Sequence, residues 1–211
     1  MLVASDLADL MKDALGFGDF DTSDENLGFA EAIVEHLQTA VVNHLPGSIL
    51  GIAPPSGGPL TNGEAVPVPG NILLVPADLV AGLSAKLGQS TPEIAGIAEA
   101  ISEHFLTAGV QFETGDITGT CTNTPASPGA LIGEGTGGKI VFLSGPILAA
   151  EMADGINQPS VSPELLELAN AIVDYVGDNA EVSYATGTVT GTAPAGGGPI
   201  PDGAGTGGTI A

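Results

Sequence analysis

One segment of the chain occurs three times, and this internal repeat constrains the fold more than any other feature. The first copy, 29–40, reads Phe-Ala-Glu-Ala-Ile-Val-Glu-His-Leu-Gln-Thr-Ala, and the second, 97–108, reads Ile-Ala-Glu-Ala-Ile-Ser-Glu-His-Phe-Leu-Thr-Ala. A shorter third copy begins at Leu168 with Leu-Ala-Asn-Ala-Ile-Val-Asp-Tyr. The copies begin at 29, 97 and 168, so the offsets are 68 and 71 residues. Nearly constant offsets predict a protein built from repeated structural units.

Each copy is preceded by a short helix and lies in a longer one. The short helices are indicated by apolar residues at every fourth position, which fall on one stripe of a helix. Thr91-Pro-Glu and Ser162-Pro-Glu are typical helix starts, because the hydroxyl caps free N–H groups and Pro suits the first turn. The long helices are predicted over 24–44, 92–107 and 163–176. The short-helix stripes are Leu7, Met11 and Leu15; Leu79, Leu83 and Leu87; and Leu148, Met152 and Ile156.

After each long helix the pattern changes to that of extended chain. Alternating Thr and β-branched residues predict a strand, and a Gly- and Pro-rich loop and a second strand follow. Recurring glycines suggest a bend or a close approach of backbones. The first copy carries two extra residues between Gly63 and Ile72, compared with Gly133 to Ile140. The predicted first strands are 46–53, 114–121 and 186–193, the loops are 54–63, 122–133 and 194–203, and the second strands are 70–75, 138–143 and 208–211.

These elements predict an α+β fold of three tandem repeats, each a short helix, a long helix and a β-hairpin, over 1–75, 76–145 and 146–211. About 70 residues bury little surface alone, so we expect the repeats to share one core and form a single domain. An open solenoid has atypical terminal repeats. Because the terminal repeats here are as intact as the middle one, we expect a closed ring with pseudo-threefold symmetry, with an open array as the alternative.

Four candidate residues stand at positions that align between repeats. His36, His104 and Tyr175 share one position, and two imidazoles and a phenol on one level of a ring suggest a metal site. The Tyr instead favours a structural position that needs bulk and an amphipathic tip, and we predict no metal. Cys121 aligns with alanines, which predicts a buried structural thiol rather than a reactive one.

Three further patterns resemble sites but fit structural roles better. The carboxylate pairs Glu31 with Glu35 and Glu99 with Glu103, whose counterparts are Asn170 and Asp174, suggest acid–base catalysis, but no nucleophile accompanies them and a solvated helix face is expected. The run 19–26 resembles the start of a calcium loop, but its sixth and twelfth positions are Asp24 and Ala30, where Gly and Glu are required. The glycines of 133–138 precede a strand without Gly-Lys-Ser/Thr, which argues against a nucleotide. We predict no catalytic, cofactor-binding or metal-binding residue.

The charge of the chain restricts its partners. There are 25 acidic residues against three Lys and no Arg, which gives a net charge of −22. Phosphate backbones are bound by Lys and Arg, so we expect no nucleic-acid partner, and an anionic membrane surface would repel the chain. A strongly acidic surface favours docking onto basic proteins. The single Cys excludes an intramolecular disulfide, and we find no signal peptide and no membrane-spanning run.

The hairpin runs of the third repeat carry a resemblance to a known class of proteins. Thr-Gly-Thr-Val-Thr-Gly-Thr-Ala-Pro-Ala-Gly-Gly-Gly-Pro, 186–199, and Gly-Ala-Gly-Thr-Gly-Gly-Thr-Ile, 203–210, resemble small structural proteins of tailed-bacteriophage virions. The resemblance implies a non-enzymatic component of the tail, neck or capsid surface, localised in the virion and assembling with other virion proteins or with itself. The alternatives are a cellular or secreted binding module that holds a ligand or glycan in its Gly/Pro loops, and an enzyme that uses the Glu/His face.

Overall fold

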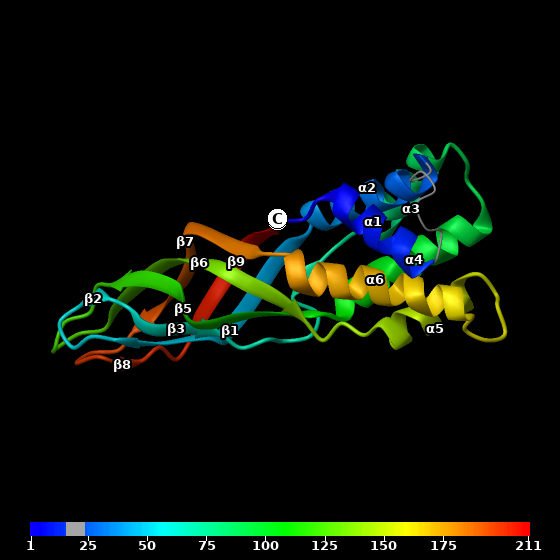
Figure 1. The fold of residues 1–211 in the computed structure, drawn as a ribbon. Coiled ribbons are helices and arrows are strands. Elements are labelled where there is room, and N and C mark those ends of the chain that lie inside the picture. Colours follow the sequence, from blue (N-terminus) through cyan, green and yellow to red (C-terminus); the bar gives the residue numbers. More distant parts are fainter. Residues whose placement is uncertain (16–23) are drawn as a thin grey trace. The chain divides into compact units, whose positions relative to one another are not determined.

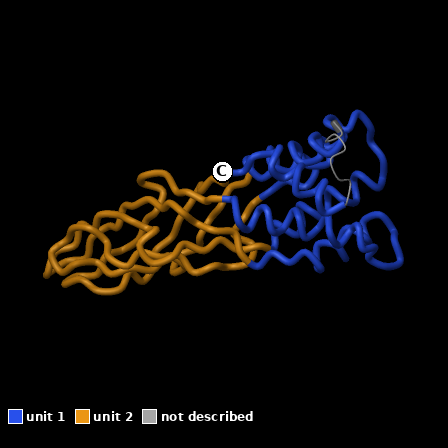
Figure 2. The backbone as a smooth tube through the Cα atoms, in the orientation of Figure 1, with its two compact units in different colours: residues 1–39, 74–107, 142–180 blue, residues 40–73, 108–141, 181–211 orange. Residues whose placement is uncertain are grey.

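The chain folds into two compact units that alternate along the sequence (Figure 2). A computed structural model describes residues 1–15 and 24–211. Unit 1 consists of 1–39, 74–107 and 142–180, and unit 2 consists of 40–73, 108–141 and 181–211. Each unit therefore takes one segment from each third of the chain, and the chain passes from helices to strands three times (Figure 1).

Unit 1 contains six helices in its described part, and they form a closed ring of packing contacts. Each helix packs against the next one along the chain, and α6 packs against α1. The apolar stripes predicted for the short helices face inward, since Leu7, Leu79 and Leu148 are fully buried. The helices are α1 (Ala4–Ala14), α2 (Asp24–Gln38), α3 (Pro76–Leu87), α4 (Pro92–Thr107), α5 (Gly145–Gly155) and α6 (Pro163–Asn179).

The helix boundaries follow local signals, with one exception. The hydroxyls of Thr91 and Ser162 accept the amides of Ile94 and Leu165 at 3.3 and 3.2 Å, so both predicted starts are confirmed. The prediction that the first long helix continues to residue 44 is wrong, because α2 ends at Gln38. The hydroxyl of the next residue, Thr39, donates to the carbonyl of His36 at 2.7 Å, and the β-branched pair that follows adopts a strand.

Unit 2 is a closed antiparallel barrel of six strands, with three two-residue strands beside it. The second strand of each hairpin lies between its own first strand and the first strand of the next hairpin. Thus β3 pairs with β1 and β5, β6 pairs with β5 and β7, and β9 pairs with β7 and β1. The strands are β1 (Val41–Ala53), β2 (Gly58–Pro59), β3 (Thr61–Ala65), β4 (Ile72–Leu73), β5 (Gly109–Cys121), β6 (Gly129–Val141), β7 (Val182–Ala193), β8 (Gly198–Pro199) and β9 (Gly203–Ile210).

Most strands are longer than the Thr/Gly pattern predicts, and the loops are shorter. The predicted strand 70–75 is wrong, because only Ile72–Leu73 pairs there and the return strand of the first hairpin is β3, inside and just after the predicted loop. The first strands begin about five residues early, at Val41, Gly109 and Val182, because inward and outward residues already alternate there. The return strands β6 and β9 also begin within the predicted loops. The first strands bend at Gly47, Gly115 and Gly187, whose φ values are +86°, +103° and +88°. Glycine adopts such positive φ values without strain, which explains why it occurs at all three bends.

The predicted α+β class is confirmed, and the strand layer is closed rather than open. The buried residues of each unit are mostly Ala, Val, Leu and Ile, in keeping with the low aromatic content. In the part of the chain that the structure describes, no helix has both the length and the apolar character needed to cross a membrane.

Candidate interaction surface

Three aromatic rings meet inside the barrel, and they come from positions that align when the three predicted repeats are compared. His44, Phe112 and Tyr184 each precede a bending glycine by three residues, and none is more than 2% exposed. Their ring centroids are 5.9 Å apart for His44 and Phe112, 5.8 Å for His44 and Tyr184, and 5.4 Å for Phe112 and Tyr184. We call these three residues the ring cluster. Sequence reasoning missed it because His44 was assigned to a helix.

The glycines of the return strands make room for the ring cluster. A Cβ at Gly138 would lie 2.5 Å from Phe112, and one at Gly208 would lie 2.9 Å from Tyr184. Such distances are sterically forbidden, so the glycines are required by packing. The run 133–138, considered above as a phosphate loop, lies inside β6 and serves this purpose. The barrel interior at this level is thus a packed core.

The polar atoms of the ring cluster form hydrogen bonds with groups inside the barrel. His44 Nε2 lies 2.9 Å from the carbonyl of Val110, and Nδ1 lies 2.7 Å from the Tyr184 hydroxyl. Burial lowers the pKa of His44, so the neutral ring donates from Nε2 to the carbonyl and accepts at Nδ1 from the Tyr184 hydroxyl. Burial also raises the pKa of Tyr184, which keeps that hydroxyl protonated. Asn71 accepts the amide of Val110 at 3.0 Å and closes the network.

The trio His36, His104 and Tyr175 behaves differently, because each member bonds to other groups of unit 1. His36 Nε2 lies 3.1 Å from the hydroxyl of Ser102. His104 donates from Nδ1 to Glu151 at 2.9 Å and accepts the amide of Ser144 at Nε2. The Tyr175 hydroxyl donates to the carbonyl of Val3 at 2.7 Å and accepts its amide. Among the described residues, no group of three or more His, Cys, Asp or Glu could hold a metal ion.

The other predicted candidates lie at separate places. Lys86 bridges Glu31 and Glu35 at 2.8 and 2.7 Å, while Glu99 and Glu103 are exposed on α4, as expected for a solvated helix face. Cys121 is a buried free thiol with 2% exposure, and burial raises its pKa, in line with a structural role. Most of the calcium-like run 19–26 lies outside the described residues.

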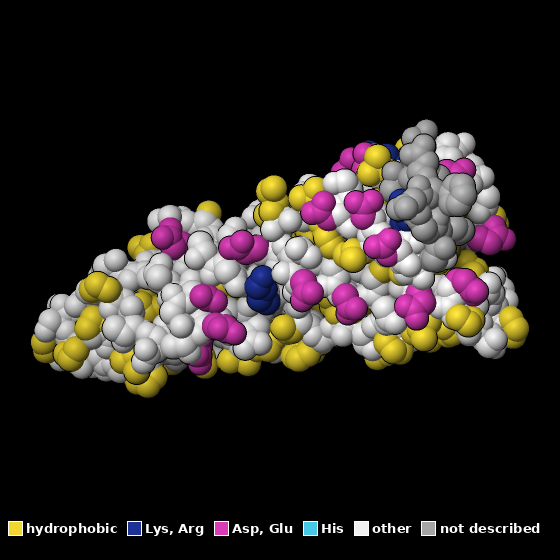
Figure 3. Space-filling model, viewed as in Figure 1, with side chains coloured by type: hydrophobic (Ala, Val, Ile, Leu, Met, Phe, Trp, Pro, Cys, Tyr) yellow, Lys and Arg dark blue, Asp and Glu magenta, His cyan; other side chains and the backbone are white. Residues whose placement is uncertain are grey.

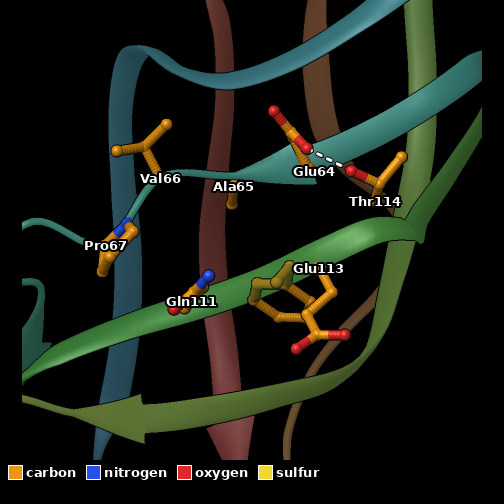
Figure 4. A pocket seen from close by; sticks show the side chains of 8 residues that line it. Glu64, Ala65, Val66, Pro67, Gln111, Glu113 and Thr114 are labelled. Carbon is orange, nitrogen blue, oxygen red and sulfur yellow. Dashed lines mark hydrogen bonds between the residues drawn. The ribbon is translucent and has the colours of Figure 1, made fainter.

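A cleft opens on the barrel wall between β3 and β5 (Figure 4). It has a volume of ≈ 510 Å³, and we call it the Glu64 cleft. The two strands pair only at Gly63 with Ile117 and Ala65 with Phe112, and the register shifts between those pairs. The hydroxyl of Thr114 donates to Glu64 across the cleft. Its lining residues are Glu64, Ala65, Val66, Pro67, Gln111, Phe112, Glu113 and Thr114.

A second, apolar hollow adjoins this cleft. Its volume is ≈ 280 Å³, and we call it the Leu45 hollow. Leu45 is 67% exposed and Leu73 is 50% exposed, although both are large apolar side chains on strands. Val41, the register partner of Leu73, is 41% exposed and extends the apolar surface. The lining residues are Asn43, Leu45, Val68, Pro69, Gly70, Asn71 and Leu73.

Both hollows result from an interruption of the first return strand. β3 ends at Ala65 and β4 starts at Ile72, whereas β6 and β9 run without a break. Pro67 and Pro69 have no N–H to donate to a neighbouring strand, and the two extra residues of this repeat fall in the same segment. Residues 66–67 line the Glu64 cleft and residues 68–69 line the Leu45 hollow, so one segment joins the two.

Among the positions that align with Leu45 and Val41, only these two carry a large apolar side chain. The positions that align with Leu45 hold Glu113 and Ala185, and those that align with Val41 hold Gly109 and Glu181. The barrel forms at those positions without a large apolar side chain. We therefore expect the barrel to fold without the large side chains of Leu45 and Val41. A contiguous exposed apolar surface of this kind is typical of a contact site.

The remaining surface is predominantly acidic or uncharged. Carboxylates are spread over the face shown in Figure 3, and lysines are rare on it. Glu64 and Glu113 line the cleft, and the carboxylate of Asp116 accepts the amide of Glu113 at 2.8 Å. Lys139 stands opposite Gln111 across the β5–β6 pair. One cation does not balance these three carboxylates, so the cleft favours positive charge in a partner.

A comparison with protein-family models finds no match, and comparisons with curated proteins and with solved structures find none either.

Proposed function

We propose that this protein is a non-enzymatic structural component of a tailed-bacteriophage virion, placed in the tail, neck or capsid surface, and that it assembles through protein–protein contacts. The observation that carries the proposal is the exposed apolar surface of Val41, Leu45 and Leu73 beside an acidic cleft. A monomer gains nothing from exposing such side chains to water, whereas burial against a partner is favourable.

We further propose that the architecture is a closed pseudo-threefold array of the repeats 1–75, 76–145 and 146–211. The sequence offsets of 68 and 71 residues support it. The ring cluster supports it too, because residues from three aligned positions make three mutual contacts. So does the pairing pattern, in which every return strand bridges two consecutive first strands. Such an array is rigid and presents stable surfaces for assembly.

A structural rather than catalytic role is supported by how the polar side chains are used. Several of the residues with catalytic potential that the sequence offered are bonded to neighbours: Lys86 pairs with Glu31 and Glu35, and His104 bonds to Glu151 and to the amide of Ser144. The virion assignment is supported by the likeness of 186–199 and 203–210 to phage structural proteins, and by a net charge of −22. Those two runs supply most of β7, β8 and β9.

The experiment that tests the proposal is mass spectrometry of purified phage particles from cells that carry this gene. We expect peptides of the protein in particles that have been purified through a density gradient, at a constant ratio to the major capsid protein. Immunogold labelling would then locate it on the tail, neck or capsid. Its absence from particles, with normal abundance in the lysate, would reject the virion assignment.

A second candidate function is a module that holds a small ligand or glycan, and the Glu64 cleft favours it. The cleft combines carboxylates with an amide and a hydroxyl, and its volume of ≈ 510 Å³ falls within the usual range for ligand sites. Saturable binding in a glycan array, lost on Glu64→Gln, would favour this function.

A further inference from the structure

The Glu64 cleft and the Leu45 hollow differ in polarity, and together they indicate what kind of partner segment could bind there. The Leu45 hollow offers exposed apolar side chains and no charged lining residue. The Glu64 cleft offers two carboxylates beside Val66 and Pro67. A side chain with an aliphatic stem and a cationic head fits the cleft, because the stem packs on Val66 and Pro67 while the head meets the carboxylates.

The charge of the protein argues against a second copy as the occupant. Two copies would each carry a net charge of −22, and like charges repel at close approach. The chain has no Arg, and Lys86 is held by Glu31 and Glu35, so only Lys12 and Lys139 of another copy could enter the cleft. A partner rich in Lys or Arg therefore fits the cleft better than a second copy does.

We propose that the Glu64 cleft and the Leu45 hollow form one docking surface for a segment of a basic partner protein, which places an apolar side chain in the hollow and a Lys or Arg in the cleft. This inference rests on the proposed assembly function and names the surface and the partner chemistry. The repeats explain why docking is limited to one place. Only the first repeat has the interrupted strand, the exposed Leu45 and the adjoining carboxylate Glu64 together.

The repeats also supply matched control variants. Glu134 aligns with Glu64 and likewise accepts a threonine hydroxyl, from Thr186, but it lines a different cleft, together with Ile132 and Thr118. Glu64→Gln and Glu134→Gln therefore change the net charge equally in similar surroundings. Leu45→Ala reproduces the alanine that the third repeat has at the aligned position 185, so folding should be preserved. Ile132→Ala removes an apolar side chain of 52% exposure from another place on the barrel.

The test uses fluorescence anisotropy with a defined probe at near-physiological salt, where weak long-range attraction is screened. The probe is a short labelled peptide in which Leu and Lys alternate, with Pro at each end to prevent helix formation. A second peptide replaces every Leu by Ser at the same charge. We expect saturable binding of the first peptide only. Leu45→Ala should weaken it roughly tenfold through lost apolar burial, and Glu64→Gln roughly threefold.

The control variants Glu134→Gln and Ile132→Ala should change the affinity less than about twofold. Equal losses for Glu64→Gln and Glu134→Gln, or equal binding of the Ser peptide, would mean attraction by charge alone and would overturn the proposal. Sedimentation equilibrium of the protein tests the other occupant: Leu45-dependent self-association would assign the surface to a second copy and also overturn it. Incorporation into particles is measured in a separate experiment. Absence from particles would reject the assembly function, whereas the peptide-binding result tests the docking surface.

Discussion

Two trios of residues at repeat-aligned positions behave in opposite ways, one in each unit of the molecule. In the barrel, His44, Phe112 and Tyr184 contact one another, and His44 and Tyr184 are joined by a hydrogen bond. In the helical unit, His36, His104 and Tyr175 each reach a different neighbouring group. The first trio is a joint packing unit, whereas the second is three separate links between helices.

The two trios show that aligned positions in a barrel and in a helical unit are constrained in different ways. Strand residues that point into a narrow barrel converge, so their identities must be chosen together with the glycines opposite them. Tyr175 instead reaches the residue before α1, and His104 reaches the residue before α5. Those contacts need a polar tip of sufficient reach, and imidazole and phenol both provide it.

The largest expected effect is the loss of a ring from the barrel. Phe112→Ala should lower the free energy of unfolding by about 3–5 kcal/mol, because it leaves a cavity among rings that cannot collapse. Urea denaturation monitored by circular dichroism measures it. A loss below about 1 kcal/mol would show that the rings are not packed together.

A double-mutant cycle sharpens the same point. Phe112→Leu combined with Tyr184→Leu should show a coupling of about 0.5–1.5 kcal/mol, as for an aromatic pair in contact. The corresponding pair in the helical unit, Tyr175→Phe with His104→Gln, should be additive because the two residues have different partners. Coupling in both pairs, or in neither, would remove the distinction between the trios.

The next effect is a loss of stability at mildly acidic pH. Burial lowers the pKa of both His36 and His44 in the folded state, and the nearby charge of Asp78 only partly opposes it for His36. Below the unfolded pKa of 6.5 the unfolded chain binds more protons, so the free energy of unfolding falls as the pH drops from there towards the folded pKa values.

The slope is at most about 1.4 kcal/mol per pH unit for each histidine. His44→Phe, which installs the ring of the aligned position 112, should remove one histidine's share of this slope. Denaturant unfolding of both proteins at several values between about pH 7.5 and pH 5.5 tests this, since most carboxylates titrate below that window. Identical slopes would mean that His44 takes up its proton in the folded barrel.

Much of the helical part of the fold was predictable from particular residues. Leu79 and Leu83 reveal their buried stripe by spacing, and Thr91-Pro-Glu sets the start of α4 because its cap is local. The end of α2 was not predictable from apolar spacing, because Leu37, Ala40 and His44 continue the helical period past its true end. Extended chain is favoured over helix there because Val41 and Val42 pair with β4 and β9. The residues of β9 are far away in the sequence, so local patterns do not reveal this pairing.

The candidate surface was less predictable. The two extra residues before Ile72 were visible, but an apolar Leu45 in a strand would normally be assigned to the core. Its exposure depends on where Pro67 and Pro69 direct the neighbouring segment, and on the register that points His44 inward. The ring cluster could not be found from the repeat, because its three positions hold three different residues, His, Phe and Tyr, which have in common only a buried ring.

A smaller effect is expected from removing one hydroxyl in each trio. Tyr184→Phe should cost about 1–3 kcal/mol, because it leaves His44 Nδ1 buried without a donor. Tyr175→Phe should cost about 0.5–1.5 kcal/mol and act locally, by freeing the backbone of Val3. Hydrogen exchange tests the distinction: the second variant should speed exchange of amides in α1 only, and faster exchange in the barrel strands would contradict it.

The smallest effect concerns a third aligned position, held by Ala53, Cys121 and Ala193, all at most 2% exposed. Two of these three positions hold a buried alanine, so Cys121→Ala should lower the free energy of unfolding by at most about 1 kcal/mol. Burial raises the pKa of the thiol, and the thiolate is the reactive form, so Cys121 should react with Ellman's reagent only after unfolding. Ala193→Cys is the matched control and should be equally protected. Rapid labelling of native Cys121 alone would show that this position, unlike its two counterparts, opens to solvent, and would set the thiol apart from a packing role.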